Sequence, residues 1–200
     1  MKDAKITKET VIRDFILGKS ENLFVCYGFE KTSMDMIARA CDLSKPTLYN
    51  YFQGKNDLFM DIHVRLHERI NGIILEFLKQ DKDRLEVLEE IVDSTVRLVD
   101  AHREFLRVFN LEYHHLTHKN LSEHIDWSIS NRRTMAGVLT RFLDGIVQAE
   151  VKKRFEVESV ASLILSVFDM LFFDLAVNES DRAATYKELL FYIIKRSLLK

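Results

Sequence analysis

The chain has little of what loops, sheets and disulfide frameworks require. Only one proline and six glycines stand among its 200 residues, while 47% of the residues are apolar. Such scarcity excludes a fold rich in tight turns and favours long, uninterrupted helices. The two cysteines, Cys26 and Cys41, are too few for a disulfide framework, and both fall on apolar helical faces, which predicts reduced core thiols. The sequence therefore predicts an all-α protein.

Long apolar runs without charge are missing as well. The most apolar stretch, residues 160–177, has the length of a membrane span, but Asp169 and Asp174 lie inside it at a heavy cost in lipid. We therefore expect a buried helix there and no membrane partner. The first nine residues are polar and mixed in charge, without the apolar core of a secretory signal, so the sequence predicts a cytoplasmic protein.

A large excess of basic charge, typical of indiscriminate nucleic-acid binding, is the third absence. The net charge is −2. Residues 1–55 nevertheless hold nine basic and seven acidic side chains, a balance of +2, and residues 56–200 hold 20 and 24, a balance of −4. With so weak a bias, affinity for nucleic acid would need two copies of a binding surface.

The order of residues in the segment 32–58, TSMDMIARACDLSKPTLYNYFQGKNDL, predicts a local structure. Thr32 can cap a short helix whose apolar residues recur at helical spacing. Two residues, of which Asp42 is the turn residue, separate that helix from Ser44, a second cap, and Pro46 fits the first turn that follows. Two short helices joined by so tight a turn must cross steeply. The segment therefore predicts a helix-turn-helix unit.

The second helix of this unit has an apolar side and a polar side. Leu48 and Phe52 fall on the apolar side. The polar side is formed by Lys45, Pro46, Thr47, Tyr49 and Asn50. It offers hydroxyls, an amide and one cation, groups that suit phosphate oxygens and base edges. The alternative is a plain surface helix, but a merely solvated face is more often rich in Glu and Lys.

Fixed spacings run through this segment and beyond it. They join Thr32, Ile37-Ala38, Ser44, Leu48-Tyr49, Tyr51-Phe52 and Lys55, with Leu23-Phe24 and Gly28-Phe29 upstream and Leu58-Phe59 downstream. The set resembles the signature of the tetracycline-repressor (TetR) family of one-component transcriptional regulators. Asp42 and Pro46 stand where that family often has glycine. Both residues fit the expected backbone, so we expect the fold to be kept and the preferred bases to differ.

The resemblance implies a helix-turn-helix DNA-binding domain of three helices over residues 1–55 and a ligand-binding and dimerisation domain over residues 56–200. It implies that the following residues form the DNA-binding surface: Thr32 or Ser33 at phosphate, Ser44 at the second cap, Lys45, Pro46, Thr47 and Asn50 near bases, and Tyr49, Tyr51 and Lys55 on the DNA backbone. Two such surfaces in a homodimer would require a roughly palindromic operator.

Helical periodicity divides the chain into about nine helices. The first is expected from about Thr7 to Tyr27, with Gly28 as a left-handed stop. Its inward residues are predicted to be Ile12, Phe15, Ile16, Leu23 and Tyr27. Residues 149–157 are expected to form a charged crossing between the seventh and eighth helices.

The last two helices are more apolar than one chain can cover, which predicts a second subunit. In the resembled family this pair of helices forms the dimer interface. The residues predicted to form it are Leu163, Val167, Met170, Leu171, Leu190 and Ile194. Asp174 falls within the apolar arc of the eighth helix, so its carboxylate needs a partner in the core, in a second subunit or on a cationic ligand.

Residues 56–200 contain no glycine-rich phosphate loop and no nucleophile elbow, so the sequence predicts neither an enzyme nor a cofactor. Histidine spacings at His63/His67 and His114/His118, and Glu112-x-x-His115, would permit a metal site. A di-iron centre would need a second copy of the Glu-x-x-His segment, and solvated or pocket-lining histidines are the alternative. The aromatic residues that could line a ligand pocket, or form plain core, are Phe105, Phe109, Tyr113, Trp127, Phe142 and Phe168.

Together these features predict a ligand-responsive transcriptional regulator. A homodimer would bind operator DNA. An unknown small molecule that binds more tightly to a conformation in which the fourth helix has swung would release the DNA, so repression is expected. The alternative is a helical ligand- or metal-binding bundle, possibly enzymatic, whose N-terminal motif does not bind DNA.

Overall fold

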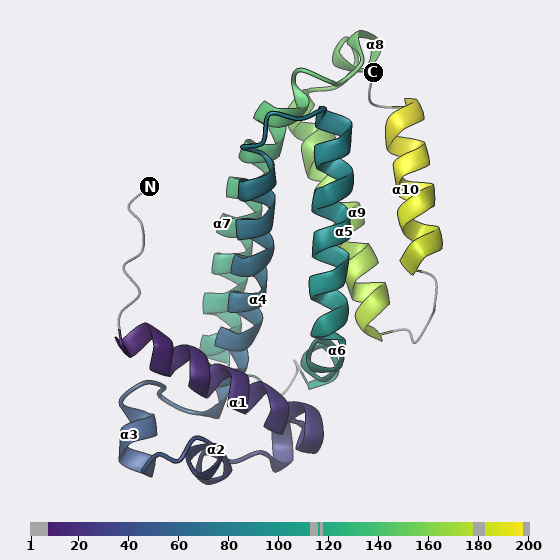
Figure 1. The fold of residues 1–200 in the computed structure, drawn as a ribbon. Helices are drawn as coiled ribbons and strands as arrows, with labels where there is room; N and C mark the ends of the chain where they lie inside the picture. Colours follow the sequence, from purple (N-terminus) through teal and green to yellow (C-terminus); the bar gives the residue numbers. More distant parts are fainter. Residues whose placement is uncertain (1–7, 113–115, 117, 178–182, 198–200) are drawn as a thin grey trace. The chain divides into compact units, whose positions relative to one another are not determined.

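The computed structural model describes residues 8–112, 116, 118–177 and 183–197. Within these ranges the chain forms ten helices and no strand, which confirms the all-α fold class (Figure 1). The helices are α1 (Lys8–Lys31), α2 (Met34–Ala40), α3 (Lys45–Tyr49), α4 (Lys55–Phe77), α5 (Arg84–Ala101), α6 (Arg103–Glu112), α7 (His118–Leu143), α8 (Ala149–Lys152), α9 (Val157–Val177) and α10 (Ala183–Ser197). The one helix beyond the nine expected is α8, a single turn inside the predicted crossing.

The chain folds into two compact units. The first comprises residues 1–67 and 104–124, and the second comprises residues 68–103 and 125–200. Helices α4 and α7 therefore contribute to both units, whereas α1, α2 and α3 belong wholly to the first. The domain boundary predicted after residue 55 coincides with the start of α4 and stays a prediction.

An aromatic cluster forms the centre of the first unit. Phe59 of α4 has no exposed surface. Its ring centroid lies 4.9 Å from that of Phe24, 4.8 Å from Phe29, 5.5 Å from Phe105 and 5.1 Å from Phe109. The pairs are tilted or edge-on, as the quadrupoles of aromatic rings favour. One side chain of α4 thus joins α1 to α6.

Helix α1 departs in part from its predicted boundaries and inward face. Gly28 has the expected left-handed backbone, with φ 76°, but helical structure resumes beyond it as far as Lys31. Phe15 and Tyr27, predicted to face inward, are 49% and 52% exposed. The buried residues are Ile16, Leu17, Ser20, Phe24 and Phe29. Apolar residues occupy more than one side of α1, so periodicity alone did not select the buried side.

The two cysteines lie in different environments. Cys41 is buried, as predicted, whereas Cys26 is exposed on α1, so the expectation that both are core thiols was wrong for Cys26. Burial raises the pKa of the Cys41 thiol, which keeps it in the neutral form.

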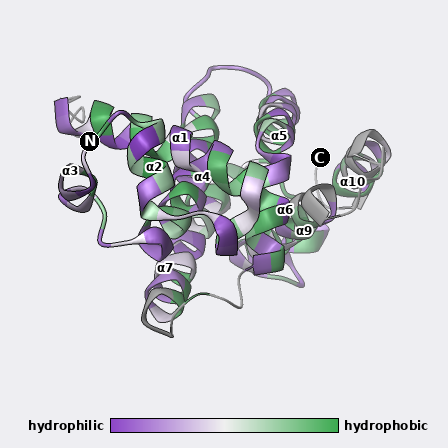
Figure 2. Cartoon of the chain, turned by 90° about the horizontal axis from the view of Figure 1, so that it is seen from below, coloured by the Kyte–Doolittle hydropathy of each residue, from purple (hydrophilic) through white to green (hydrophobic). Residues whose placement is uncertain are grey.

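The second unit packs α5 against α9 and α10. One cluster of buried residues in its core comprises Leu88, Leu139, Leu143, Val147, Val160, Ala161, Ile164 and Ile194. Figure 2 shows apolar and polar residues along the same helices, the pattern expected when one side of a helix is packed. No helix in the described part of the chain is both long enough and apolar enough to cross a bilayer.

Candidate nucleic-acid interface

Two serine caps and one left-handed residue shape the helix-turn-helix unit. Ser33 caps α2 and accepts a hydrogen bond from the Met36 N–H at 3.2 Å, so the cap lies one residue after the predicted Thr32. Ser44 caps α3 as predicted and accepts from the Thr47 N–H at 3.2 Å. Between the helices, Asp42 has φ 55°, which confirms it as the turn residue.

Thr32 has a structural position. Its side chain is only 1% exposed, and its hydroxyl lies 2.7 Å from the Gly28 carbonyl, to which it donates. The hydroxyl is also 3.2 Å from the carbonyl of Leu23. Thr32 therefore secures the chain between α1 and α2, and of the predicted pair Thr32 or Ser33 only Ser33 is exposed.

The predicted division of α3 into two sides is confirmed by burial. Leu48 and Phe52 are 0% and 1% exposed and belong to the core of the first unit. The exposed residues from the second cap onward are Ser44, Lys45, Pro46, Tyr49 and Asn50, while Thr47 is half-buried. Buried apolar anchors thus fix a short helix whose polar side is open to solvent.

The one charged side chain on α3 is paired. Nζ of Lys45 lies 2.8 Å from Oδ1 of Asp35 in the first turn of α2. A hydrogen bond from the ammonium to Asp35, reinforced by the charge of that carboxylate, raises the pKa of Lys45. The ammonium therefore keeps its charge beside the exposed side of α3.

Lys55 and Tyr51 are attached to α1 as well as lying near the unit's surface. Nζ of Lys55 donates to the carbonyl of Phe29 at 2.8 Å and lies 4.3 Å from the centre of the Phe29 ring. The Tyr51 carbonyl accepts from the Arg13 guanidinium at 2.8 Å, and the Tyr51 side chain is half-buried. Nζ also donates to the Glu30 carbonyl at 3.3 Å, so one of the three N–H donors of the ammonium is left for a phosphate.

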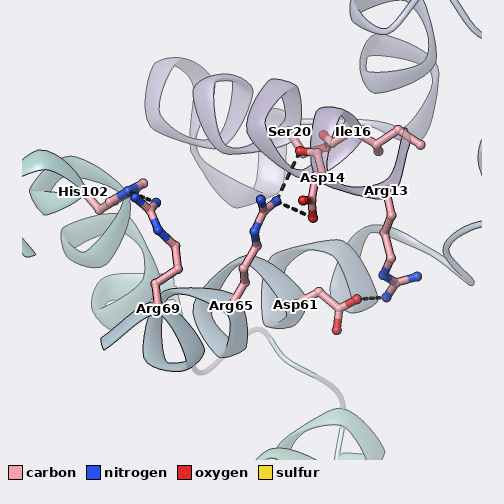
Figure 3. A network of polar contacts seen from close by, with 8 residues as sticks. All are labelled: Arg13, Asp14, Ile16, Ser20, Asp61, Arg65, Arg69 and His102. Carbon is pink, nitrogen blue, oxygen red and sulfur yellow. Dashed lines mark hydrogen bonds and ion pairs between the residues drawn. The ribbon is translucent and has the colours of Figure 1, made fainter. Parts of the chain in front are cut away.

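Two ion pairs join α1 to α4 within the first unit (Figure 3). Arg13 pairs with Asp61, and its guanidinium also lies 4.2 Å from the ring centre of Phe52. Arg65 pairs with Asp14 at 3.0 Å. Sequence reasoning missed these contacts because their partners are 48 and 51 residues apart. They tie the part of α4 that belongs to the first unit to α1.

Histidines from two helices meet in the first unit. Nδ1 of His63 lies 3.1 Å from Nε2 of His124, and the His63 ring stacks on Phe109 at a centroid distance of 3.9 Å. The His67 ring centroid is 4.7 Å from that of His63. Burial, followed by the neighbouring imidazoles, holds the pKa of His63 well below its ordinary value, and burial also lowers the pKa of His124.

Among the described side chains, no group of three or more His, Cys, Asp or Glu residues has a geometry that would hold a metal ion. His114 and His115 lie outside the described residues, as does the side chain of His118. The histidine pair that sequence spacing suggested, His63/His67, therefore forms part of a packed cluster with His124 from α7.

The histidine cluster predicts a loss of stability in mild acid. As the pH falls below about 6.5 the unfolded state gains protons, while buried His63 and His124 resist protonation. The contribution of these histidines to the free energy of unfolding is therefore fully present above that pH and decreases below it. Each such histidine contributes up to about 1.4 kcal/mol per pH unit within its window. Urea unfolding at fixed protein concentration between pH 7.5 and 5 measures this slope.

The variant H63Q should reduce the dependence of the free energy of unfolding on pH by up to about 1.4 kcal/mol per pH unit, which corresponds to one proton. The control is H102Q, which replaces a histidine of the second unit whose Nε2 lies 2.9 Å from Nη1 of Arg69 (Figure 3). An unchanged slope in H63Q would contradict the role given to the cluster.

The predicted pocket residues divide between the two units. Phe105 and Phe109 are 1% and 3% exposed in the aromatic core of the first unit. Phe142 and Phe168 pack partly buried against the core of the second unit, and Trp127 is half-buried. Tyr113 lies outside the described residues. Core packing accounts for the positions of Phe105 and Phe109. Aromatic residues at helical spacing suit a core as well as a pocket, so their spacing could not distinguish the two roles.

Part of the sequence of the first unit matches a known family. The family model described as "Bacterial regulatory proteins, tetR family" matches residues 16–62, from the buried part of α1 to the first turns of α4. Residues 16–62 are thus similar to the TetR family of transcriptional regulators. The matched segment contains both serine caps, the Asp42 turn and the Phe59 anchor.

Relatives and solved structures extend the TetR-family likeness beyond the matched segment. An uncharacterized HTH-type transcriptional regulator, YhgD of Bacillus subtilis (strain 168), is 21% identical over 81% of this chain and 83% of its own length. The HTH-type transcriptional regulator AcrR of Shigella flexneri is 35% identical over 42% of this chain and 41% of its own. A TetR-like transcriptional regulator from Rhodococcus sp. RHA1 shares the fold, with TM-score 0.66 and 20% identity over 96% of this chain and 97% of that one.

Proposed function

We propose that the chain is a TetR-family regulator, a cytoplasmic repressor that binds a palindromic DNA operator as a homodimer and is released by a small-molecule inducer. The exposed polar side of α3 carries the proposal. Buried Leu48 and Phe52 hold that side outward, where hydroxyl and amide groups can reach base edges in a major groove. The proposed contacts are Ser33, Ser44, Lys45, Pro46, Thr47, Tyr49, Asn50, Tyr51 and Lys55, while buried Thr32 positions the chain.

The apolar surface of α9 and α10 supports the proposed dimer. Leu163 and Met170, seven residues apart on one side of α9, are 57% and 66% exposed. Among the described side chains of these two helices, the other large exposed apolar residues are Phe173, Leu189, Tyr192 and Ile193. Ile194 is buried in the second unit's own core, so it leaves the proposed interface. Val167 is half-buried, and the side chains of Leu171 and Leu190 lie outside the described part of the chain.

The ion pairs of α4 supply the proposed route from ligand to DNA. Because Arg13 and Arg65 tie α4 to α1, any displacement of α4 would carry the helix-turn-helix unit with it. A ligand that binds a displaced form more tightly would then change the spacing of two such units and release the operator. Trp127, Phe142 and Phe168 of the second unit are the proposed contacts for that ligand. Half-buried Asp174 on α9 could meet a cationic group.

Two substitutions test the proposed DNA contacts. K55A should weaken binding to every duplex by a similar factor, and the salt slope should flatten by about 0.9 for each phosphate that the variant no longer neutralises. N50A should instead relax the choice of one base, reducing affinity for the preferred sequence by about 1–3 kcal/mol. Fluorescence anisotropy on duplexes selected from a random pool measures both effects.

The control for these variants is K79A, an exposed lysine of the second unit, which should bind as the wild type does. Unchanged binding in both K55A and N50A would reject the assigned surface. Failure of the wild-type protein to select any duplex would reject DNA binding itself.

A further inference from the structure

The ion pair between α2 and α3 lies on the proposed DNA-binding surface. It joins Asp35 to Lys45, whose side chains remain 55% and 51% exposed. Lys45 is the one charged residue in the α3 sequence KPTLY. The only cation that α3 offers to a duplex is therefore held by a carboxylate before DNA arrives.

This pairing has different consequences for phosphates and for bases. A lysine alone is a point charge that attracts any phosphate, and each phosphate neutralised adds affinity without regard to sequence. Beside Asp35, a phosphate would meet a second anion, so much of its attraction to Lys45 is cancelled. A base edge is neutral, and the ammonium has three N–H donors, of which the carboxylate occupies one at 2.8 Å. Two donors remain for acceptors such as guanine O6 and N7.

We propose that Asp35 is a specificity-determining residue, which pairs with Lys45 to suppress sequence-independent phosphate binding while leaving the ammonium able to contact a base edge. The inference rests on the proposed DNA-binding function and adds a residue to it. Asp35 acts through Lys45 and needs no contact with the duplex.

The experiment compares D35N, K45A and the double variant D35N/K45A. The control E9Q removes one negative charge from an exposed residue in the first turn of α1. Each protein binds a duplex selected by the wild type from a random pool and a scrambled duplex of the same composition. Anisotropy is recorded from 50 to 200 mM salt, and thermal melting followed by circular dichroism shows that each variant is folded.

We expect D35N to bind the scrambled duplex about 3- to 10-fold more tightly at low salt, a modest gain because exposed ion pairs are weak. Its salt slope should steepen by about 0.9 for each lysine released. Affinity for the selected duplex should rise less, so the ratio of the two affinities falls. In the K45A background D35N should have no effect, and E9Q should match the wild type.

Two results would overturn the inference. One is equal binding of the scrambled duplex by D35N and the wild type. The other is a gain that persists in the K45A background, because direct repulsion of DNA by Asp35 would then explain it. If the wild type distinguishes the two duplexes, either result removes only the role of Asp35. If the wild type binds neither duplex, the proposed function fails as well.

Discussion

The double variant L163E/M170E is expected to be monomeric and to lose at least about 100-fold in operator affinity. Two half-sites bound by one dimer gain from effective concentration, and that gain of about 100- to 10,000-fold is absent in a monomer. Leu163 and Met170 share one exposed side of α9, so formation of the proposed dimer would bury two glutamates from each subunit and place like charges near its two-fold axis. Analytical ultracentrifugation gives the mass, and anisotropy on the selected duplex gives the affinity.

A matched control separates the dimer from the change in charge. L111E/F155E adds the same two charges at positions that are 60% and 59% exposed and lie on neither α9 nor α10. It should remain dimeric and bind the operator about as tightly as the wild type. A dimeric L163E/M170E that still binds tightly would show that another surface joins the subunits.

Local features of the DNA-binding unit could be predicted because neighbouring residues determine them. The Ser44 cap, the left-handed Asp42 and the positive φ of Gly28 each depend on a few consecutive residues. The position of the first cap was wrong by one residue, because Thr32 and Ser33 are both capping types and burial of Thr32 decides between them.

Contacts between distant residues could not be predicted in the same way. The i, i+4 spacing of His63 and His67 was visible, but their neighbour His124 comes from another helix, 61 residues after His63. The Asp35–Lys45 pair depends on how α2 and α3 cross. The turn between the helices implies a steep crossing, but it does not determine where the two side chains lie. Phe105 fitted pocket and core equally well by periodicity, and only packing on Phe59 assigns it to the core. The helices could therefore be predicted from the sequence better than the contacts between them.

The variant F59A is expected to be the most destabilising single substitution considered. Phe59 is fully buried, and removal of its ring would leave a cavity bordered by Phe24, Phe29, Phe105 and Phe109. Deletion of a buried phenylalanine costs about 3–5 kcal/mol, since lost burial and cavity terms add. In a chain of this size the midpoint of thermal unfolding should fall by roughly 6–20 °C.

Phe59 contacts several helices, so the loss of stability in F59A should affect more of the first unit than α4 alone. Its ring joins α4 to both α1 and α6 in the aromatic cluster, so F59A should weaken the support of the helix-turn-helix unit and raise its local unfolding. F59L, which fills most of the cavity, should recover much of the stability, and F155A at an exposed site should change it by about 0.5 kcal/mol or less. Urea unfolding followed by circular dichroism compares the three. A loss below about 1 kcal/mol in F59A would mean that the cluster does not hold α4 in place.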